Sequence, residues 1–163
     1  SAGVVILEEA SSVVGTPKVI TKERIVLNGS ATRSNDNTVL DAIVFQSNRT
    51  GLPHVAWTLS ETLEIVSYSV NLADGGDTGL QFALGYGTKT KYRISGMSIL
   101  PNTTLTLTPA SSHAPTIDSL TLTSAYTLNA GEVLGLMIVA GDTVVSDGGQ
   151  MLSVTIEARR NVV

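Results

Sequence analysis

Histidine and serine carry out much of the catalysis that proteins perform near neutral pH, and this chain offers few of them in a catalytic arrangement. The two histidines, His54 and His113, lie far apart beside prolines. Neither has a second ligand at a metal-binding spacing. Ser98 follows Gly96 and Met97 but lacks the second glycine of a Gly-x-Ser-x-Gly turn. We therefore predict no general base, no serine nucleophile and no metal ligand among these residues.

Pairs of carboxylates can hydrolyse glycosidic bonds when their spacing suits the two roles. Glu8 and Glu9 are adjacent, and Glu61 and Glu64 flank the start of a predicted strand. Neither spacing is diagnostic, so we interpret all four as solvated surface carboxylates. The sequence predicts no enzyme.

Two loops combine acidic residues with glycines, as calcium loops do. Asp74-Gly75-Gly76-Asp77-Thr78-Gly79 lacks further acidic ligands and a late bidentate glutamate, and Asp142 with Asp147-Gly148-Gly149 forms a second loop of this kind. Tight connections between strands explain the glycines without a metal. We therefore expect the protein to fold without a metal ion or any other cofactor.

Some shorter motifs carry little weight. Three Asn-x-Ser/Thr sequons, at Asn28, Asn48 and Asn102, matter only in a secreted eukaryotic protein, and the absence of cysteine disfavours that setting. Gly85-Tyr86-Gly87 is too short for a dinucleotide fingerprint, so we interpret it as close packing or a bulge within a strand. Sugar-binding sites usually present exposed aromatic rings, and several of the aromatic residues here alternate with predicted core positions: Trp57, Tyr68, Tyr86, Tyr92 and Tyr126.

Lys89, Lys91 and Arg93 stand two residues apart. In a strand they would lie on one face and form a basic stripe in an acidic protein. The stripe is either a solvated face that protects a sheet edge or a contact for an acidic partner surface.

The short apolar run Val4, Val5, Ile6 and Leu7 is separated from the next predicted strand by residues 8–17, which are rich in loop signals. Four such side chains must be buried somewhere. The run is either the first strand of the domain's own sheet or an arm that docks on a neighbouring subunit. We therefore divide the chain into an N-terminal strand or arm, residues 1–17, and one domain, residues 18–163.

Composition indicates what holds these residues in place. The chain has 163 residues, which suits one domain that buries a core without disulfides. Only 15 % of residues are charged, 42 % are hydrophobic, and cysteine is absent. A net charge of −4 argues against a nucleic-acid partner, and no apolar stretch is long enough to span a membrane. The abundance of Thr, Val and Gly is typical of an all-β protein.

Two-residue alternation recurs along the chain, whereas helical periodicity does not. We expect about eight to ten strands and an antiparallel β-sandwich. A strand over residues 18–27 should end in a hairpin-type turn at Asn28-Gly29. Val66, Tyr68, Val70 and Leu72 should share one face. Further strands are predicted over residues 91–99, 104–108, 119–128, 133–139 and 151–159, with 133–139 buried on both faces.

The last third of the chain has a characteristic order of features. Leu128-Asn129-Ala130-Gly131-Glu132 leads into the apolar strand 133–139, and an acidic glycine loop and a final strand follow. This order resembles the closing strands of jelly-roll modules in viral structural proteins. The low charge, the lack of cysteine and the Thr, Val and Gly content over residues 60–163 resemble the capsid decoration (cement) proteins of tailed bacteriophages.

The resemblance implies a jelly-roll-like sandwich with an extended N-terminal segment. It also implies a non-enzymatic virion protein, a homotrimer assembled in the host cytoplasm and bound to capsid protein on the capsid exterior. It assigns no individual residue. Its partners would be capsid protein and copies of itself, without nucleic acid, membrane or small-molecule ligand. The pattern also resembles receptor- or carbohydrate-binding modules of phage tail or head fibres, which is the alternative function.

Overall fold

The computed structural model describes residues 7–9, 20–33, 53, 55–73, 81–88, 97–111, 114–140 and 150–162. Within these residues the chain forms ten β-strands, and every strand pair is antiparallel. No helix in this part of the chain is long and apolar enough to cross a membrane. The strands are β1 (Leu7–Glu9), β2 (Ile20–Arg33), β3 (Val55–Thr58), β4 (Leu63–Leu72), β5 (Gln81–Thr88), β6 (Ser98–Ile99), β7 (Leu105–Thr106), β8 (Thr116–Leu128), β9 (Glu132–Ala140) and β10 (Gln150–Asn161).

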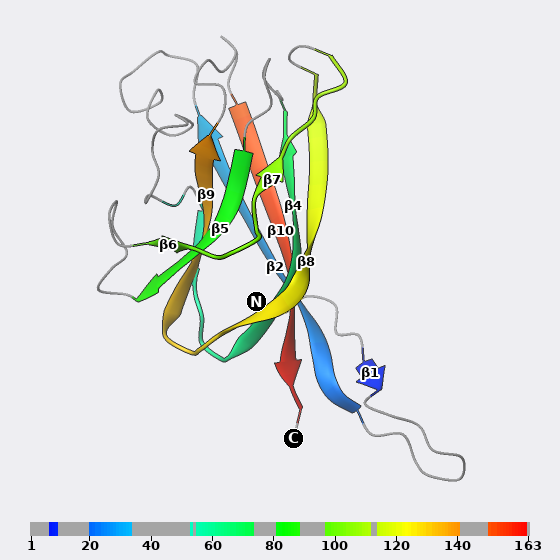
Figure 1. Ribbon diagram of the computed structural model, residues 1–163, viewed down its shortest axis with the longest axis vertical. Helices are drawn as coiled ribbons and strands as arrows, with labels where there is room; N and C mark the ends of the chain where they lie inside the picture. Colours follow the sequence, from blue (N-terminus) through cyan, green and yellow to red (C-terminus); the bar gives the residue numbers. More distant parts are fainter. Residues whose placement is uncertain are drawn as a thin grey trace.

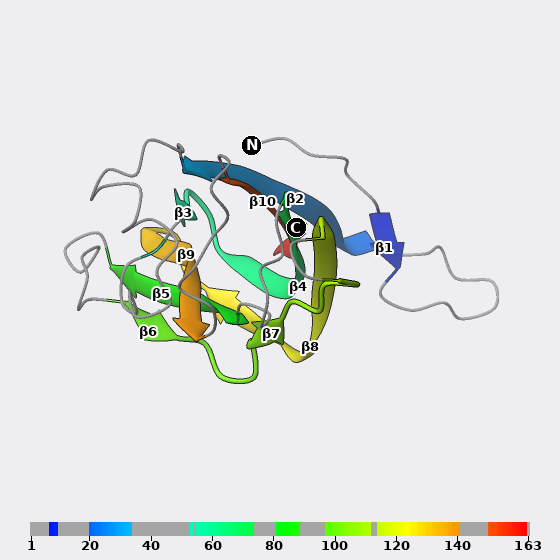
Figure 2. The ribbon, with the colours of Figure 1, turned by 90° about the horizontal axis from the view of Figure 1, so that it is seen from above.

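The strands form two sheets that face each other (Figures 1 and 2). Sheet A has the order β1-β2-β10-β4-β8, and sheet B has the order β3-β9-β5-β6, with β7 also paired to β5. From β2 to β10 the chain changes sheet at every connection except those from β5 to β6 and from β6 to β7. Two four-stranded antiparallel sheets linked in this way form a jelly roll. The predicted all-β sandwich with jelly-roll topology is confirmed, and β1 is an addition at the edge of sheet A.

β6 and β7 are two parts of one interrupted strand. Both pair with β5, and the turn at Pro101–Asn102 separates them. Within the interruption, Leu100 N donates to Leu84 O at 2.8 Å, and Leu84 N donates to Thr103 Oγ1 at 3.1 Å. A threonine hydroxyl thus takes the place of a strand carbonyl. The expected strands over 91–99 and 104–108 are therefore short here, since only Ser98–Ile99 and Leu105–Thr106 are strand and residues 91–96 lie outside the described part.

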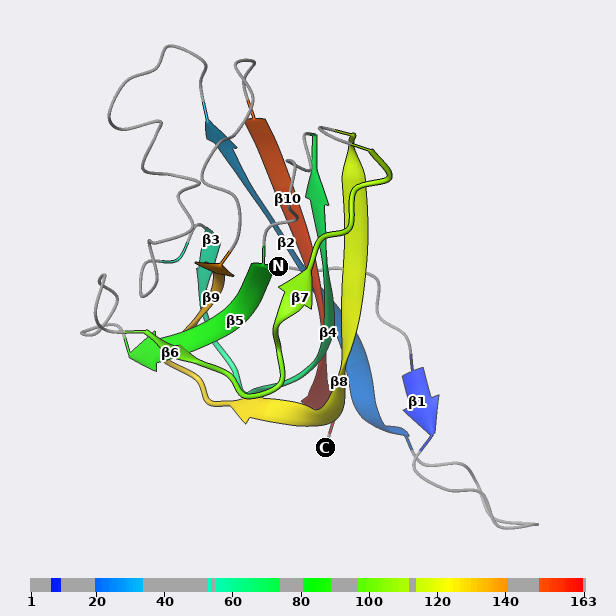
Figure 3. The same cartoon turned by 45° about the horizontal axis from the view of Figure 1, so that its top comes forward.

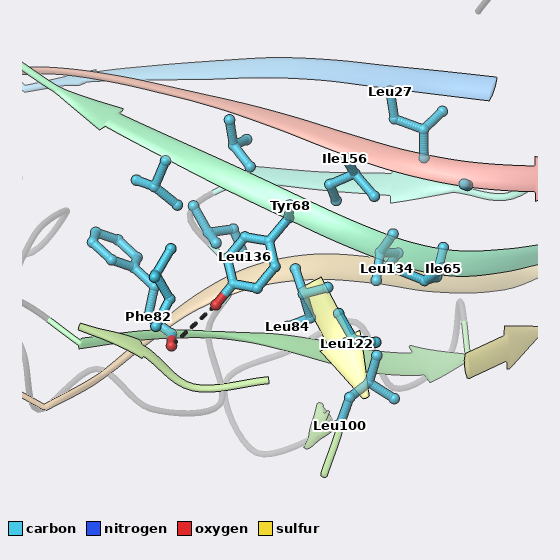
Figure 4. Packing of buried hydrophobic residues seen from close by; sticks show 14 of the residues in the cluster. Leu27, Ile65, Tyr68, Phe82, Leu84, Leu100, Leu122, Leu134, Leu136 and Ile156 are labelled. Atoms are coloured by element: carbon cyan, nitrogen blue, oxygen red, sulfur yellow. Dashed lines mark hydrogen bonds between the residues drawn. The ribbon is translucent and has the colours of Figure 1, made fainter. Parts of the chain in front are cut away.

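The core lies between the sheets and is mostly aliphatic (Figure 4). β10 alternates as predicted, because Leu152, Val154, Ile156 and Ala158 are all buried. β9 is buried on both faces, also as predicted: Leu134 and Leu136 face the main core, while Val133 and Met137 join Met97 in a second cluster. Both predictions rest on the alternation of side chains between the two faces of a strand, and this alternation does not depend on the neighbouring strands.

The predicted turn at Asn28-Gly29 is wrong. β2 continues through both residues to Arg33 and pairs with β10 along this length. Tertiary packing accounts for the glycine, because a Cβ on Gly29 would lie 2.4 Å from Val55 Cγ1 and 2.8 Å from Trp57 Cζ2. Trp57 Nε1 also donates to Asn28 O at 3.2 Å. Gly29 therefore lets β2 approach β3 closely rather than reverse the chain.

The expected common face of Val66 and Tyr68 is also wrong. Ile65 pairs with Ala158 and Ser67 with Glu157, so Val66 has no partner on β10. The extra residue is a β-bulge, which shifts the alternation by one position. Leu63 and Ile65 therefore point into the core before the bulge, and Tyr68 and Val70 do so after it.

β8 carries a larger irregularity on the other side of β4. Ile65 pairs with Tyr126 and Ser67 with Thr121, so residues 122–125 have no partners on β4. Beyond this irregularity residues 126–128 pair with β4 again, and the end of β8 bends toward sheet B (Figure 3). The predicted alternation over 119–128 is interrupted here, because Thr123, Ser124 and Ala125 are all exposed.

Candidate functional site

The groups considered for catalysis do not converge in the described residues. His54, His113 and both acidic glycine loops lie outside this part of the chain, so the predictions about them stay predictions. Ser98 is an exposed residue of β6. No group of three or more His, Cys, Asp or Glu within the described part could hold a metal ion.

Glu61 and Glu64 are engaged by two different cations. Glu64 Oε2 lies 2.7 Å from Lys22 Nζ, and Glu61 Oε2 lies 3.4 Å from Arg160 Nη1. Each carboxylate faces a cation from a different strand, Lys22 of β2 or Arg160 of β10, so the geometry favours a structural role for both.

Gly85 is explained by packing. A Cβ at this position would lie 2.9 Å from Met137 Cγ on the neighbouring strand β9. The interpretation of Gly85-Tyr86-Gly87 as close packing within a strand is confirmed. Of the three sequons, Asn28 lies in β2 and Asn102 in the exposed Pro101–Asn102 turn, while Asn48 is outside the described residues.

The N-terminal run reaches the described structure at Leu7. Leu7 pairs with Glu23 and Glu8 with Lys22, so β1 lies along the start of β2 at the edge of its own sheet. Val4, Val5 and Ile6 lie outside the described residues, as do Lys89, Lys91 and Arg93. The docking hypotheses for both groups remain predictions.

β1 belongs to a part of sheet A that extends past the sandwich. We call β1, residues 20–24 of β2 and residues 159–161 of β10 the projecting end. β10 pairs with β2 as far as Asn161, whereas its pairing with β4 ends at Arg159. Figure 1 shows the projecting end beyond the turns that join β3 to β4 and β8 to β9.

Ion pairs join the projecting end to the neighbouring strands of sheet A. Lys22 of β2 pairs with Glu64 of β4, and Arg24 of β2 pairs with Glu157 of β10. Ser67 Oγ also donates to Glu157 Oε2 at 3.1 Å. The partners are up to 133 residues apart in the chain, so no sequence spacing could have indicated these contacts.

A third ion pair lies on the inner face of β2 and β10, the face whose other side chains point into the core. Arg160 Nη2 lies 2.7 Å from Glu23 Oε2. The hydrogen bond to Glu23 raises the pKa of Arg160 further above its ordinary value, and the nearby Glu61 adds to this. Charged residues replace the apolar inner row of β2 and β10 here, so the core ends before the projecting end begins.

A groove of about 410 Å³ lies beside the stretch of β8 that has no partners on β4, residues 122–125. Its floor contains Leu122 and Tyr126, and its rim contains small or polar residues with Pro101 and Asn102. Asn102 has a φ of 58°, as the third residue of a tight turn after proline requires. This groove was not predicted from the sequence. The run of small residues Thr123, Ser124 and Ala125 inside an alternating strand is the signal that could have indicated it.

Tyr126 joins this groove to the core. Its ring packs against Tyr86 with centroids 5.9 Å apart. Desolvation, together with the hydrogen bond to Tyr86, raises the pKa of Tyr126, so its phenol stays protonated at neutral pH. A neutral phenol beside an apolar floor can stack on a ligand and donate one hydrogen bond.

The comparisons with known proteins assign no family. No protein-family model matches the sequence, and no curated protein is similar to it. Solved structures that are similar in backbone include the following three. They are an empty particle of Kashmir bee virus at acidic pH (13 % identity, TM-score 0.39, 86 % of this chain and 92 % of that chain), the pentamer of Israel acute paralysis virus (12 %, 0.37, 84 % and 88 %) and the globular domain of zebrafish complement 1qA protein (12 %, 0.33, 80 % and 94 %). At such identities and TM-scores these structures say nothing about function.

Proposed function

We propose that this protein is a non-enzymatic structural component of a virus particle and binds the capsid surface as a decoration or cement protein. The observation that carries the proposal is β1. The jelly roll is complete with β2 to β10, and β1 adds a strand to sheet A at an end that projects past the core. Beyond its pairing with β2 of the same chain, β1 offers a further sheet edge, and strand addition at such an edge is a recurrent way for one chain to bind another.

In this proposal residues 1–17 form a contact segment and residues 18–163 form the domain. The partners are capsid protein and copies of the same chain, arranged as a trimer on the capsid exterior. The low proportion of charged residues suits large repeated contacts, because charge is depleted at interface centres. Lys89, Lys91 and Arg93 would add an electrostatic contact to an acidic partner surface.

The first test is the composition of particles. Density-gradient-purified virus particles from the source of this sequence should contain peptides of the chain at a copy number comparable to that of the major capsid protein. Absence of these peptides from purified particles, with the protein abundant elsewhere in the same cells, would refute the virion role.

The second test concerns the N-terminal segment. Changing Val4, Val5, Ile6 and Leu7 to serine in the full chain should weaken capsid binding at least tenfold and leave the domain folded. The matched control changes Glu8 and Glu9 to glutamine, which alters the neighbouring polar residues and should leave binding unchanged. Loss of the folded monomer in the serine variant would instead make the run an ordinary strand of its own domain.

One observation favours a second function. The groove beside Tyr126 combines an aromatic ring, an exposed asparagine and hydroxyl side chains, which is the chemistry of carbohydrate sites. In this alternative the protein is a receptor- or carbohydrate-binding module of a tail or head fibre. Binding on a glycan array that is lost in Tyr126→Ala but kept in Tyr68→Phe would support it. No glycan binding together with capsid association would support the decoration role.

A further inference from the structure

One edge of sheet A is long and has no strand beside it. β8 is the last strand in the order β1-β2-β10-β4-β8. Residues 116–121 of β8 pair regularly with β4 on one side, and no described strand pairs with them on the other. At the opposite edge of sheet A, β1 pairs only with residues 20–23 of β2, so residues 24–33 of β2 also have no described strand on that side. Val55 and Trp57 of β3 lie against that stretch at Gly29. The edge strands β1, β3, β6 and β7 have between two and four residues each.

Natural proteins usually protect such an edge with lysine, proline, a bulge or a covering segment. The segment 116–121 reads Thr-Ile-Asp-Ser-Leu-Thr and contains neither lysine nor proline. Its one charge, Asp118, accepts a hydrogen bond at its carboxylate from Thr108 N at 2.7 Å, in the segment that follows β7. The bulge begins only at Leu122, after six regular residues.

The outer side of this edge also carries an apolar side chain. Ile117 is 67 % exposed, more than any other large hydrophobic residue in the described part of the chain. Ser119 and Thr121 follow it on the same face and are exposed too. A regular edge strand that carries an exposed isoleucine and neither lysine nor proline is suited to pairing with another strand.

We infer that β8 is a self-association edge, on which the β8 strand of a second copy pairs antiparallel about a two-fold axis near Ser119. A second copy brings the same free edge, so the contact is self-complementary, as two-fold interfaces require. With Ser119 opposite Ser119 of the second copy, Ile117 faces Thr121 and Asp118 faces Leu120. No like charges meet in this register, and the two A sheets become one continuous sheet.

This contact differs from the projecting end, because β1 and β8 lie at opposite edges of sheet A. It also does not depend on the virion role, since it requires only that two copies meet. The particle composition test and the test below can therefore fail independently. A trimer formed through other surfaces would be joined to its neighbours by this contact.

The absence of cysteine makes a direct test simple. Residues directly opposite each other in an antiparallel pair have Cα atoms about 4.5 to 5.5 Å apart, within the range that a disulfide can bridge. The variant Ser119→Cys should form a disulfide-linked dimer under mild oxidation at least tenfold faster than Thr155→Cys. Thr155 is exposed on the same face of sheet A, two strands away, and is the matched control.

A second variant tests the edge without a crosslink. Ile117→Lys adds a protecting charge and should weaken self-association at least tenfold by sedimentation equilibrium. Ile99→Lys is the control, because Ile99 is also a strand isoleucine and is 42 % exposed. Equal crosslinking rates for Ser119→Cys and Thr155→Cys, or a chain that stays monomeric at all concentrations, would overturn the inference.

Discussion

Thr103 provides the sharpest test of how the interrupted strand of sheet B is completed. Its side chain is completely buried in the interruption between β6 and β7. Thr103 Oγ1 donates to Leu100 O at 2.7 Å and accepts from Leu84 N at 3.1 Å. The main-chain oxygen of Thr103 accepts a hydrogen bond from Tyr68 Oη, which reaches across from sheet A. One residue thus completes the sheet B ladder and bonds to sheet A.

The change Thr103→Val keeps the shape of the side chain and removes the hydroxyl. It leaves Leu84 N–H and Leu100 C=O buried without these partners, at a cost of about 1–3 kcal/mol each. The expected loss is therefore about 2–6 kcal/mol of unfolding free energy. For a chain of this size that corresponds to a fall in Tm of roughly 4 to 24 °C.

Thr103→Ser is the matched control, because it keeps the hydroxyl and removes one methyl group. This variant should lower the free energy of unfolding by about 1 kcal/mol. Thermal unfolding followed by circular dichroism, and urea unfolding followed by the fluorescence of Trp57, would measure both variants. If the valine variant is no less stable than the serine variant, the hydroxyl does not complete the ladder and the reasoning is wrong.

Three further changes test other parts of the fold. Gly29→Ala should lower the free energy of unfolding in urea by about 1–3 kcal/mol, because its Cβ meets Val55 and Trp57. An unchanged urea midpoint would contradict the close approach of β2 to β3. Gly131→Ala has open space but a φ of +89°, so it should cost about 1–2 kcal/mol through backbone strain alone, with Trp57 fluorescence unchanged. Burial raises the pKa of Tyr68 above its ordinary value of 10.0. The unfolded chain therefore loses this proton first as the pH rises above about 10, and wild-type stability should fall there relative to Tyr68→Phe, with no such divergence between pH 7 and 9; parallel Tm curves up to pH 11 would count against it.

The inner and outer faces of most strands were predictable from the sequence. The rows of β10 and the two-sided burial of β9 follow from side-chain alternation alone, as Ile156 and Met137 illustrate. Alternation is a local property of an extended chain, because successive side chains point to opposite faces whatever the neighbouring strand is. Composition and turn spacing were also enough to indicate an antiparallel sandwich.

The candidate site was less predictable. The apolar run at the N-terminus was evident, but its pairing with β2 was not. The ion pairs of Lys22 with Glu64 and Arg24 with Glu157 join residues distant in the chain. Such contacts depend on which strands become neighbours, and the sequence pattern of a single strand does not contain that information.

The sequence by itself determined the fold class, the aliphatic core and the order of strand-like segments, because these follow from composition and from a repeat of two. Only the tertiary structure decided where that repeat breaks. Val66 is bypassed by both neighbours of β4, and Gly29 continues a strand instead of ending it. The free edge of β8 and the groove at its bulge were decided in the same way. Register, bulges and edges are set by pairing between distant segments, and that pairing exists only once the two sheets have come together.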